Sequence, residues 1–221
     1  MSIFAAIPVK TLLESKTRLS KVLKPEECRT LTLAMLEDVL KAVIQSSKVR
    51  SVALVSSDPK VQDFASNFGV IHILEKKRGL NQAIDQAVIW CIKNDAESIL
   101  ILPADIPLIR PSDVRKIINL CSDEMCIAIA PSQRGGTSAL LQRPPNLIKP
   151  SFGPNSFSRH LAQASKKKIT AKVFYSKRLI MDIDFPEDLE KLLEIEAQTM
   201  SHRFLKQIGL DARLKKYLKD R

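Results

Sequence analysis

The chain has 221 residues, of which 45% are hydrophobic and 5% aromatic, and its formal net charge is +11 at pH 7. This length suits one ordinary α/β domain, and no apolar run approaches the roughly 20 residues that span a bilayer, so no membrane partner is expected. The aromatic residues are few and do not alternate with the basic ones, which disfavours a stacking surface for nucleic acid. The positive charge then indicates another anionic partner or simply a solvated basic surface.

The cysteines and the N-terminal residues indicate the cellular compartment in which the protein acts. The four cysteines, Cys28, Cys91, Cys121 and Cys126, include no Cys-x-x-Cys pair, which argues against zinc and against a disulfide framework. The first residues, MSIFAAIPVK, carry no basic segment before their short apolar stretch, unlike a secretory signal. We therefore expect a reducing compartment and a cytoplasmic location.

Apolar runs alternate with helical patterns over the first 120 residues. Strands are expected at Ile3–Val9, Val52–Val55, Val70–Leu74 and Ser98–Leu102. Helices are expected from Pro25, after Asp58-Pro59, after Gly79-Leu-Asn81 and over Pro111–Leu120. Repeated strand–helix order predicts a parallel sheet covered by helices on both faces.

The rhythm changes after Cys126. Two strands, Cys126–Ala130 and Ser138–Arg143, now follow each other without a helix between them. We then expect a helix around Ser156–Ser165, strands near Val173–Tyr175 and Leu179–Ile183, and a helix from Pro186.

Asp105 stands between two prolines in ILILPADIPLI, directly after a strand that should be buried. Ligands of open α/β sheets bind beyond the carboxyl ends of the strands, and the prolines stiffen this turn. The acid is therefore a candidate site residue. The alternative is that Asp105 only ends the strand or caps the next helix.

A second acidic stretch, LIMDIDFPEDL, places Asp182 and Asp184 at the end of another expected strand. Side chains alternate along a strand, so both carboxylates project to one side and Ile183 to the other. Like charges that close repel and usually share a cation. Asp184 has the alternative role of capping the helix that starts at Pro186.

Candidate anion sites accompany these acids, although the chain has neither a P-loop motif nor a Gly-x-Gly-x-x-Gly motif. The first strand leads into a loop that carries Lys10, Lys16 and Arg18 at the ligand edge of the sheet. Thr137 follows a Gly-Gly pair, and Gly153 precedes a helix whose N-terminus favours a phosphate or carboxylate. Each of these stretches is alternatively a plain turn.

The ordered motifs IPVK…SKTRLS, LPADIPL, GGTSALL, FGPNSF…H and DIDFPEDL resemble the 2-phospho-L-lactate guanylyltransferase family, which serves biosynthesis of the deazaflavin coenzyme F-420. The resemblance covers residues 1–195 and departs from the family pattern at Ser138, which is often Asn. It implies a GT-A-like nucleotidyltransferase fold: a Rossmann-like, mostly parallel central sheet with helices on both faces and a small mixed β region.

The resemblance also implies a reaction, in which GTP and 2-phospho-L-lactate, or a related phospho-acid such as phosphoenolpyruvate, give lactyl-2-diphospho-5′-guanosine and pyrophosphate. By similarity, Asp105, Asp182 and Asp184 bind Mg²⁺, and the phospho-acid is held by Thr137, Gly153 and Ser156. The basic residues Lys10, Lys16 and Arg18 then hold the triphosphate, Lys16 and Arg18 acting in catalysis beside Asp105.

Other assignments stay open. Asn81 is a candidate contact to the base or ribose, or equally part of a helix start, and His160 is interpreted as a packing or surface histidine. Rival functions are a glycosyltransferase using a nucleotide sugar, a molybdopterin guanylyltransferase-like or sugar-phosphate nucleotidyltransferase enzyme, and a non-enzymatic basic protein that binds nucleic acid.

The last residues form an amphipathic pattern, RFLKQIGLDARLKKYLKD, interrupted near Gly209. We therefore divide the chain into a nucleotidyltransferase domain, 1–197, and a C-terminal helical extension, 198–221. The apolar face of the extension docks either on its own domain or on a second subunit, and we favour a homodimer.

Overall fold

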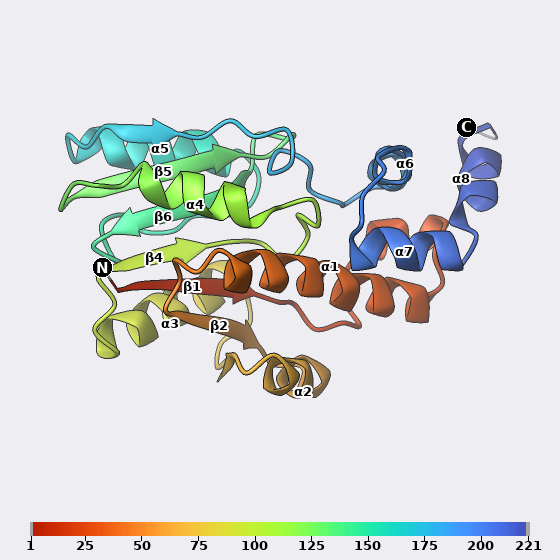
Figure 1. Ribbon diagram of the computed structural model, residues 1–221, viewed down its shortest axis with the longest axis horizontal. Coiled ribbons are helices and arrows are strands. Elements are labelled where there is room, and N and C mark those ends of the chain that lie inside the picture. The colour runs from red at the N-terminus through yellow and green to blue at the C-terminus, as the bar shows by residue number, and fades with distance from the viewer. Residues whose placement is uncertain (1, 220–221) are drawn as a thin grey trace.

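The computed structural model describes residues 2–219, and in this range the chain forms a seven-stranded sheet with helices on both faces (Figure 1). The strands are β1 (Ile3–Pro8), β2 (Ser51–Ser56), β3 (Ile71–Leu74), β4 (Ser98–Ile101), β5 (Cys126–Pro131), β6 (Thr137–Arg143) and β7 (Ala171–Val173). The helices are α1 (Pro25–Gln45), α2 (Pro59–Asn67), α3 (Leu80–Lys93), α4 (Pro111–Asn119), α5 (Ser156–Lys166), α6 (Pro186–Glu194), α7 (Met200–Gln207) and α8 (Leu210–Lys219), with a 3-10 helix, η1 (Thr17–Lys21).

The sheet is mostly parallel, as expected. Its strand order is β3-β2-β1-β4-β6-β5-β7, and only β6 runs antiparallel to its neighbours. The register pairs Ile101 of β4 with Leu140 of β6, so β6 begins where β4 ends. The first residues of β6 therefore share the ligand edge of the sheet with the loop that follows β4.

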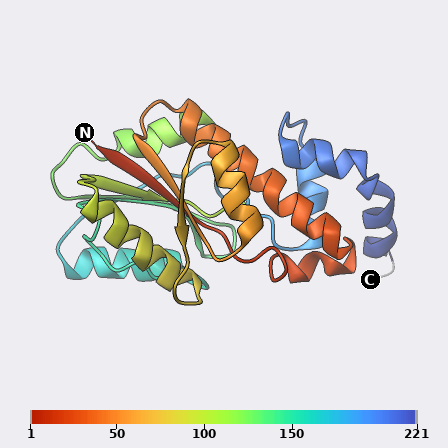
Figure 2. The same ribbon diagram turned by 90° about the horizontal axis from the view of Figure 1, so that it is seen from below.

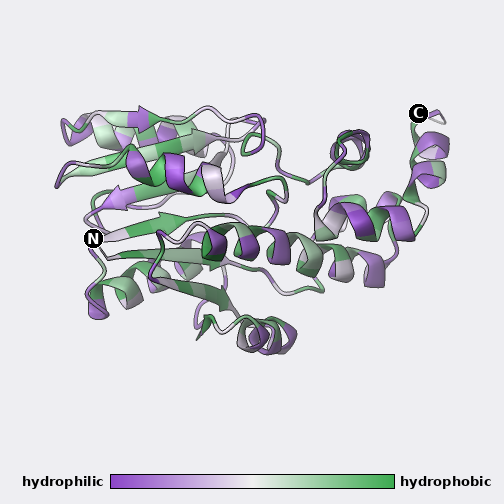
Figure 3. Cartoon of the chain, viewed as in Figure 1, coloured by the Kyte–Doolittle hydropathy of each residue, from purple (hydrophilic) through white to green (hydrophobic). Residues whose placement is uncertain are grey.

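Two apolar cores cover the two faces of the sheet. One joins α1, α2 and α4 to the sheet, and the other joins α3 and α5 (Figure 2). The central strands are hydrophobic along their length, whereas the outer faces of the helices are hydrophilic (Figure 3). This pattern is typical of parallel strands buried on both sides. No helix of the described residues is both long enough and apolar enough to cross a bilayer.

Prolines mark four helix starts where the sequence predicts them. Pro25, Pro59, Pro111 and Pro186 each occupy the first turn of a helix. A proline there removes an N–H that has no partner within the helix, and its fixed φ suits the first turn.

The expected strand at Leu179–Ile183 is wrong. These residues form no strand; Gln133 N instead donates to Ile180 O at 2.8 Å, and Ile183 N to Asp105 O at 3.0 Å. The segment thus bonds to loops rather than to a sheet neighbour. The strand expected near Val173–Tyr175 lies earlier, as β7.

The structure contains one disulfide, although the sequence argued against a disulfide framework. Cys121, just after α4, and Cys126, at the start of β5, form a disulfide with their Cα atoms 5.5 Å apart. A search for Cys-x-x-Cys misses this pair, because the turn between α4 and β5 brings together cysteines five residues apart. The cysteines therefore no longer support a reducing compartment. Cys28 and Cys91 are free and buried.

The C-terminal helices cover their apolar face within the chain. Leu205, Leu210 and Leu214 are buried in a third core together with Leu19 of η1 and Ile183. Asp38 of α1 also accepts hydrogen bonds from the N-terminus of α7. The extension as described, residues 198–219, docks on its own chain, whereas residues 220–221 lie outside the described range.

Candidate active site

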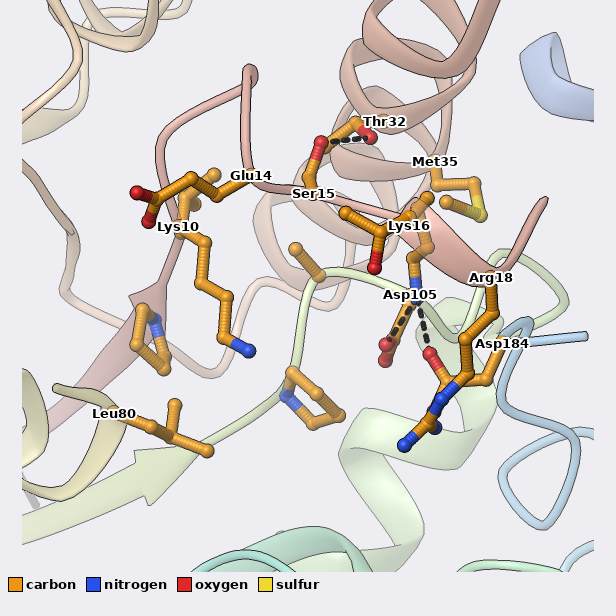
Figure 4. Close-up of a pocket in the computed structure, with 15 residues that line it drawn as sticks. Lys10, Glu14, Ser15, Lys16, Arg18, Thr32, Met35, Leu80, Asp105 and Asp184 are labelled. Atoms are coloured by element: carbon orange, nitrogen blue, oxygen red, sulfur yellow. Dashed lines mark hydrogen bonds and ion pairs between the residues drawn. The ribbon is translucent and has the colours of Figure 1, made fainter. Parts of the chain in front are cut away.

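Lys16 is the buried cation at the centre of the site. It precedes η1 with φ 56°, and its side chain is only 8% exposed. Its Nζ donates to Asp105 Oδ2 at 2.7 Å and to Asp184 Oδ1 at 2.8 Å (Figure 4). Burial lowers the pKa of Lys16, but the charges of Asp105 and Asp184 outweigh it, so the pKa is raised and the ammonium stays charged. A left-handed backbone costs a non-glycine residue about 1–2 kcal/mol, and these contacts offset that strain.

Asp105 lies in the turn after β4 and faces Lys16 rather than a helix end. Its backbone oxygen accepts from Ile183 N, which ties this turn to the second acidic segment. Helix α4 is capped by another acid, because Arg110 N donates to Asp113 Oδ2 at 3.0 Å. The alternative that Asp105 caps the next helix is therefore wrong.

Asp184 likewise does not cap α6. The carboxylate of Asp188 accepts from Asp184 N and Phe185 N, both at 2.9 Å, which leaves the Asp184 carboxylate for Lys16. Arg18 Nη1 lies 3.8 Å from Asp184 Oδ2. Burial raises the pKa of Asp184, but Lys16 and then Arg18 outweigh it, so the pKa is lowered and the carboxylate is ionised.

Asp182 is the acid of the three that does not contact Lys16. Its buried Oδ1 accepts no hydrogen bond and forms an ion pair with Arg134 Nη1 at 3.5 Å. Burial raises the pKa of Asp182, and the charges of Asp105 and Asp184 raise it further. Ile183 between Asp182 and Asp184 is fully buried. The charges of Asp105 and Asp184 act on Asp182, so the three acids are near one another, and Lys16, Arg18 and Arg134 pair with them.

The donor set suits a hard divalent cation. Mg²⁺ prefers carboxylate oxygens, and Oδ1 of Asp182, which accepts no hydrogen bond, is such a donor. Within residues 2–219, however, no three Asp, Glu, His or Cys side chains are arranged to hold a metal, because the ammonium of Lys16 bridges Asp105 and Asp184. Magnesium at Asp105, Asp182 and Asp184 therefore stays a prediction.

A groove leads away from these acids. One cavity of about 350 Å³ includes Lys16 and the two acids that it contacts. A second, of about 410 Å³, reaches Glu75 and the start of α3. Lys10 and Leu80 line both cavities, so the two form one groove, and Lys10 extends its side chain along it (Figure 4).

Thr137, Gly153 and Ser156 lie together. Ser156 Oγ donates to Thr137 Oγ1 at 3.1 Å, and Gly153, with φ 119°, forms the turn before α5. The loop before Thr137 is bonded to the acidic segment, because Gln133 Nε2 donates to Asp182 O at 2.9 Å. The structure thus brings the trio together and ties the loop before Thr137 to the acidic segment, but none of the three lines the cavity that contains Asp105 and Asp184.

Asn81 is not brought into the groove. Its Oδ1 accepts from Phe152 N at 2.7 Å, and its Nδ2 donates to Phe152 O at 3.1 Å. Both ends of the amide therefore join α3 to the loop before α5, and Asn81 does not line either cavity. It positions the turn that contains Gly153.

Arg134 and Phe185 complete the site and were missed by the sequence reasoning. Arg134 Nη2 donates to both oxygens of the buried Asp188, at 2.6 and 2.8 Å. The guanidinium carbons of Arg134 and Arg18 lie 4.5 and 4.8 Å from the centre of the Phe185 ring. Such cation–π contacts hold both guanidinium groups beside the acids. The sequence feature that could have identified Arg134 is its position directly before the Gly-Gly pair.

Glu75 was missed, whereas His160 is as expected. Glu75 directly follows β3, at the same ligand edge as the other acids, so its position in the chain could have identified it. His160 is buried against Phe152 and both of its ring nitrogens are hydrogen-bonded, which fits the interpretation as a packing histidine. The sequence feature that connects His160 to the candidate site is its spacing of four residues from Ser156, which puts both side chains on one face of the helix.

A family model described as "Guanylyl transferase CofC like" matches residues 3–221. The chain belongs to this family. A relative named phosphoenolpyruvate guanylyltransferase from Rubrobacter xylanophilus is 39% identical over 87% of this chain and 94% of its own. A relative named 2-phospho-L-lactate guanylyltransferase from Methanocaldococcus jannaschii is 36% identical over 93% of this chain and 88% of its own.

Solved structures share the fold. A Desulfovibrio desulfuricans G20 protein classed as a nucleotide-diphospho-sugar transferase aligns with a TM-score of 0.78 at 15% identity, covering 98% of this chain and 99% of that one. A nucleotidyl transferase from Methanothermobacter thermautotroptrophicus aligns with a TM-score of 0.65 at 17% identity, covering 93% and 99%. The GT-A-like fold expected from the sequence is confirmed.

Proposed function

We propose that the protein transfers GMP from GTP to a small phosphorylated carboxylic acid, 2-phospho-L-lactate or phosphoenolpyruvate, and releases pyrophosphate. The observation that carries the proposal is one cavity that contains Lys10, Lys16 and Arg18 together with Asp105 and Asp184. The names of the relatives supply the nucleotide and the class of acceptor.

The reaction needs little proton chemistry. A phosphate oxygen of the acid attacks the α-phosphorus of GTP, the bond from that phosphorus to the bridging oxygen of the β-phosphate breaks, and pyrophosphate leaves with the electron pair. Phosphate monoesters are largely dianionic at neutral pH, so no general base is required. The site accordingly depends on Lys, Arg and Asp rather than on an acid–base pair.

Neutralising charge is the main task of the site. At an effective dielectric of about 20, two unit charges about 4 Å apart repel by about 4 kcal/mol, and both reactants are polyanions. Lys10, Lys16 and Arg18 line the groove and supply positive charge for the triphosphate and the leaving pyrophosphate. Mg²⁺ held by Asp105, Asp182 and Asp184 would stabilise the negative charge that develops on the phosphoryl oxygens.

The far end of the groove suits guanine. Leu80 and Ala83 supply apolar wall, and Glu75 is held there by Gly79 N, which donates to its Oε1 at 2.9 Å. Guanine offers two adjacent donors, the N1 hydrogen and the N2 amino group, which a single carboxylate can accept together. Glu14 also lines the groove but pairs with Arg78. We therefore assign the selection of guanine to Glu75.

The context of the reaction follows from the resemblance. We propose that the product serves biosynthesis of the deazaflavin coenzyme F-420 and that the enzyme acts in the cytoplasm, where GTP is available. The homodimer expected from the amphipathic C-terminal pattern remains part of this proposal, although the apolar face of that segment is buried within the chain.

The test is a pyrophosphate-release assay. It crosses GTP, CTP, UTP and ATP with 2-phospho-L-lactate, phosphoenolpyruvate and 3-phosphoglycerate, with and without Mg²⁺. Magnesium-dependent release with GTP and one of the first two acids is expected. A glycosyltransferase would instead release a nucleoside diphosphate from a nucleotide sugar, and a nucleic-acid-binding protein would show salt-dependent affinity without turnover.

A further inference from the structure

A buried hydrogen-bonded chain lies behind the expected phospho-acid site. Its members are His160 and Ser156 of α5, which are 1% and 0% exposed, and Thr137 of β6, which is 7% exposed. Thr137 Oγ1 lies 3.0 Å from His160 Nδ1 and 3.1 Å from Ser156 Oγ. Thr137 is therefore the member of this chain nearest to solvent.

The backbone fixes the tautomer of His160. Ser151 N lies 2.9 Å from His160 Nε2, and a backbone N–H can only donate, so Nε2 is an acceptor and carries no hydrogen. Burial lowers the pKa of His160 to about 4, with a smaller effect from Arg159, so the imidazole is neutral near pH 7. Its hydrogen is then on Nδ1, which donates to Thr137 Oγ1.

Thr137 thereby accepts two hydrogen bonds, one from His160 and one from Ser156. A hydroxyl oxygen has two acceptor positions and one hydrogen, so both acceptor positions are filled. Its own hydrogen must point away from both partners. Among the described residues, these are the side-chain hydrogen bonds of Thr137, so its hydrogen is available to a ligand.

The ligand edge of the sheet is where a partner for this hydrogen would bind. Thr137 begins β6 beside the end of β4, and Gln133 joins the loop before it to Asp182. An anionic oxygen of the acceptor bound there would receive the hydrogen of a hydroxyl that is already oriented. Orientation in advance of binding saves part of the entropy that the ligand would otherwise lose.

We propose that His160 is a positioning residue for the phospho-acid: its Nδ1–H sets the Thr137 hydroxyl as a donor to an anionic oxygen of that substrate. This inference rests on the proposed function. His160 itself does not touch substrate. Its effect should therefore fall on the affinity for the acid and not on that for GTP.

Two variants each keep one of the two hydrogen bonds of His160. In His160→Asn, the amide nitrogen stands close to the position of Nδ1 and can still donate to Thr137. In His160→Gln, the amide oxygen stands close to the position of Nε2 and still accepts from Ser151, but the donor to Thr137 is lost. The two variants are matched controls for each other.

We expect His160→Gln to raise the KM for phosphoenolpyruvate or 2-phospho-L-lactate about tenfold, whereas His160→Asn stays within about threefold of the wild type. The KM for GTP should be unchanged in both. Equal effects of the two variants on the KM for the acid would show that His160 only packs, and would overturn the inference.

A double-mutant cycle isolates the path through Thr137. Thr137→Val should raise the KM for the acid at least as much as His160→Gln, and the double variant should add nothing beyond Thr137→Val, because both act through one hydroxyl. Additive effects would mean that His160 acts independently of Thr137, and would also overturn the inference.

Nitrogen-15 NMR of the wild-type protein tests the premise without turnover. We expect a neutral His160 protonated on Nδ1 at pH 7, and protonation on Nε2 would contradict the inference.

If no pair of nucleotide and phospho-acid releases pyrophosphate, the proposed function fails. The His160→Asn and His160→Gln variants are then compared by their Kd for phosphoenolpyruvate, measured by calorimetry. Equal Kd values for the two variants would again contradict the proposed role of His160.

Discussion

Lys16 occupies an unusual position for a lysine, buried between two carboxylates that come from distant parts of the chain. Its positive charge keeps Asp105 and Asp184 together when no other cation is bound. A polyanionic nucleotide offers the ammonium a second partner, and a divalent cation offers the carboxylates another one. If GTP and Mg²⁺ bind as proposed, Lys16 would therefore link the binding of the nucleotide to the release of the acids for a metal.

Asp105 is the acid whose loss should affect turnover most. In Asp105→Asn the ligand edge loses a carboxylate, while Asp184 still pairs with Lys16, so the fold should persist. We expect turnover in the pyrophosphate-release assay to fall by about 10²–10⁴-fold, with the melting temperature nearly unchanged. The matched control is Asp123→Asn, which alters an exposed acid paired with Lys172. Unchanged activity of Asp105→Asn would remove this residue from the site.

Arg18 should act on the nucleotide rather than on stability. Its side chain is 63% exposed and rests on Phe185, so Arg18→Ala removes a charge without opening the core. We expect the KM for GTP to rise about tenfold, the equivalent of one charged hydrogen bond. Arg115→Ala, on the exposed side of α4, is the control. A normal KM for GTP in Arg18→Ala would contradict the assignment of this loop to the triphosphate.

Glu75 should decide the choice of base. In Glu75→Gln an amino group replaces one carboxylate oxygen and meets a donor of guanine, so one favourable contact becomes unfavourable. We expect the ratio of kcat/KM for GTP to that for ATP to fall about 10–100-fold. Glu190→Gln, on the exposed side of α6, is the control. An unchanged preference for GTP in Glu75→Gln would exclude this carboxylate as the selective group.

The acids could be predicted from sequence because each follows an apolar run or stands beside a proline, and both are local signals. Their convergence was a further inference, and the contacts of Lys16 support it. The roles of Arg134 and His160 could not be found this way. Each depends on a partner far along the chain, Asp188 for Arg134 and Thr137 for His160, and no local pattern records such a pairing.

At the scale of elements, one buried acid joins a helix to the segment that leads to the site. Asp113 is 0% exposed; it accepts from Arg110 N at the start of α4 and from Arg178 Nε and Nη2, both at 2.7 Å. Arg178 lies in the turn before Asp182. The side chain of Asp113 thus helps to hold the acidic segment against the sheet.

Asp113→Asn should therefore destabilise the protein in a pH-dependent way. Burial raises the pKa of Asp113, but Arg178 and Arg110 outweigh it, so the pKa lies below the ordinary 3.8. The ionised acid then stabilises the fold fully above about pH 4, and the stabilisation is lost as the pH falls through the lowered pKa. We expect a loss of about 2–4 kcal/mol in the free energy of unfolding at pH 7, measured with urea.

The pH series is the internal check of this prediction. The difference between wild type and Asp113→Asn should shrink as the pH is lowered below about 4, because the wild-type acid becomes protonated. The exposed pair of Asp123 and Lys172 provides a comparison, since Asp123→Asn should leave the urea midpoint nearly unchanged. A difference that stays constant from pH 7 to pH 2 would show that ionisation of Asp113 does not contribute.

Helices and strands could be predicted from the sequence where they have their own start signal and their own apolar face toward the core. The helices that begin at Pro25 and Pro111 have both, and they were placed to within a residue at each stated end. The segment 179–183 is as apolar as a strand, but its backbone bonds to Gln133 and Asp105 in two loops rather than to a strand of the sheet. Which partner a backbone segment finds depends on the whole fold and is not encoded in five residues.

Over the whole molecule, the third core connects the C-terminus to the site. Leu205, Leu210 and Leu214 pack with Leu19, next to Arg18, and with Ile183, between Asp182 and Asp184. The sequence predicted the apolar stripe of this segment but not what covers it, because docking on the same chain and on a second subunit need the same pattern. The structure shows that the stripe supports the loops that carry the charges.

Leu205→Ala should consequently weaken both stability and nucleotide binding. Removing this fully buried side chain leaves a cavity, and we expect a loss of about 2–5 kcal/mol in the free energy of unfolding. Because the same core holds Leu19 and Ile183, the KM for GTP should rise at temperatures well below the melting point, while exposed Leu13→Ala changes neither quantity. Light scattering of both variants tests the homodimer separately: if the wild type is a dimer and Leu205→Ala keeps its mass, the C-terminal face serves its own chain and the dimer forms elsewhere.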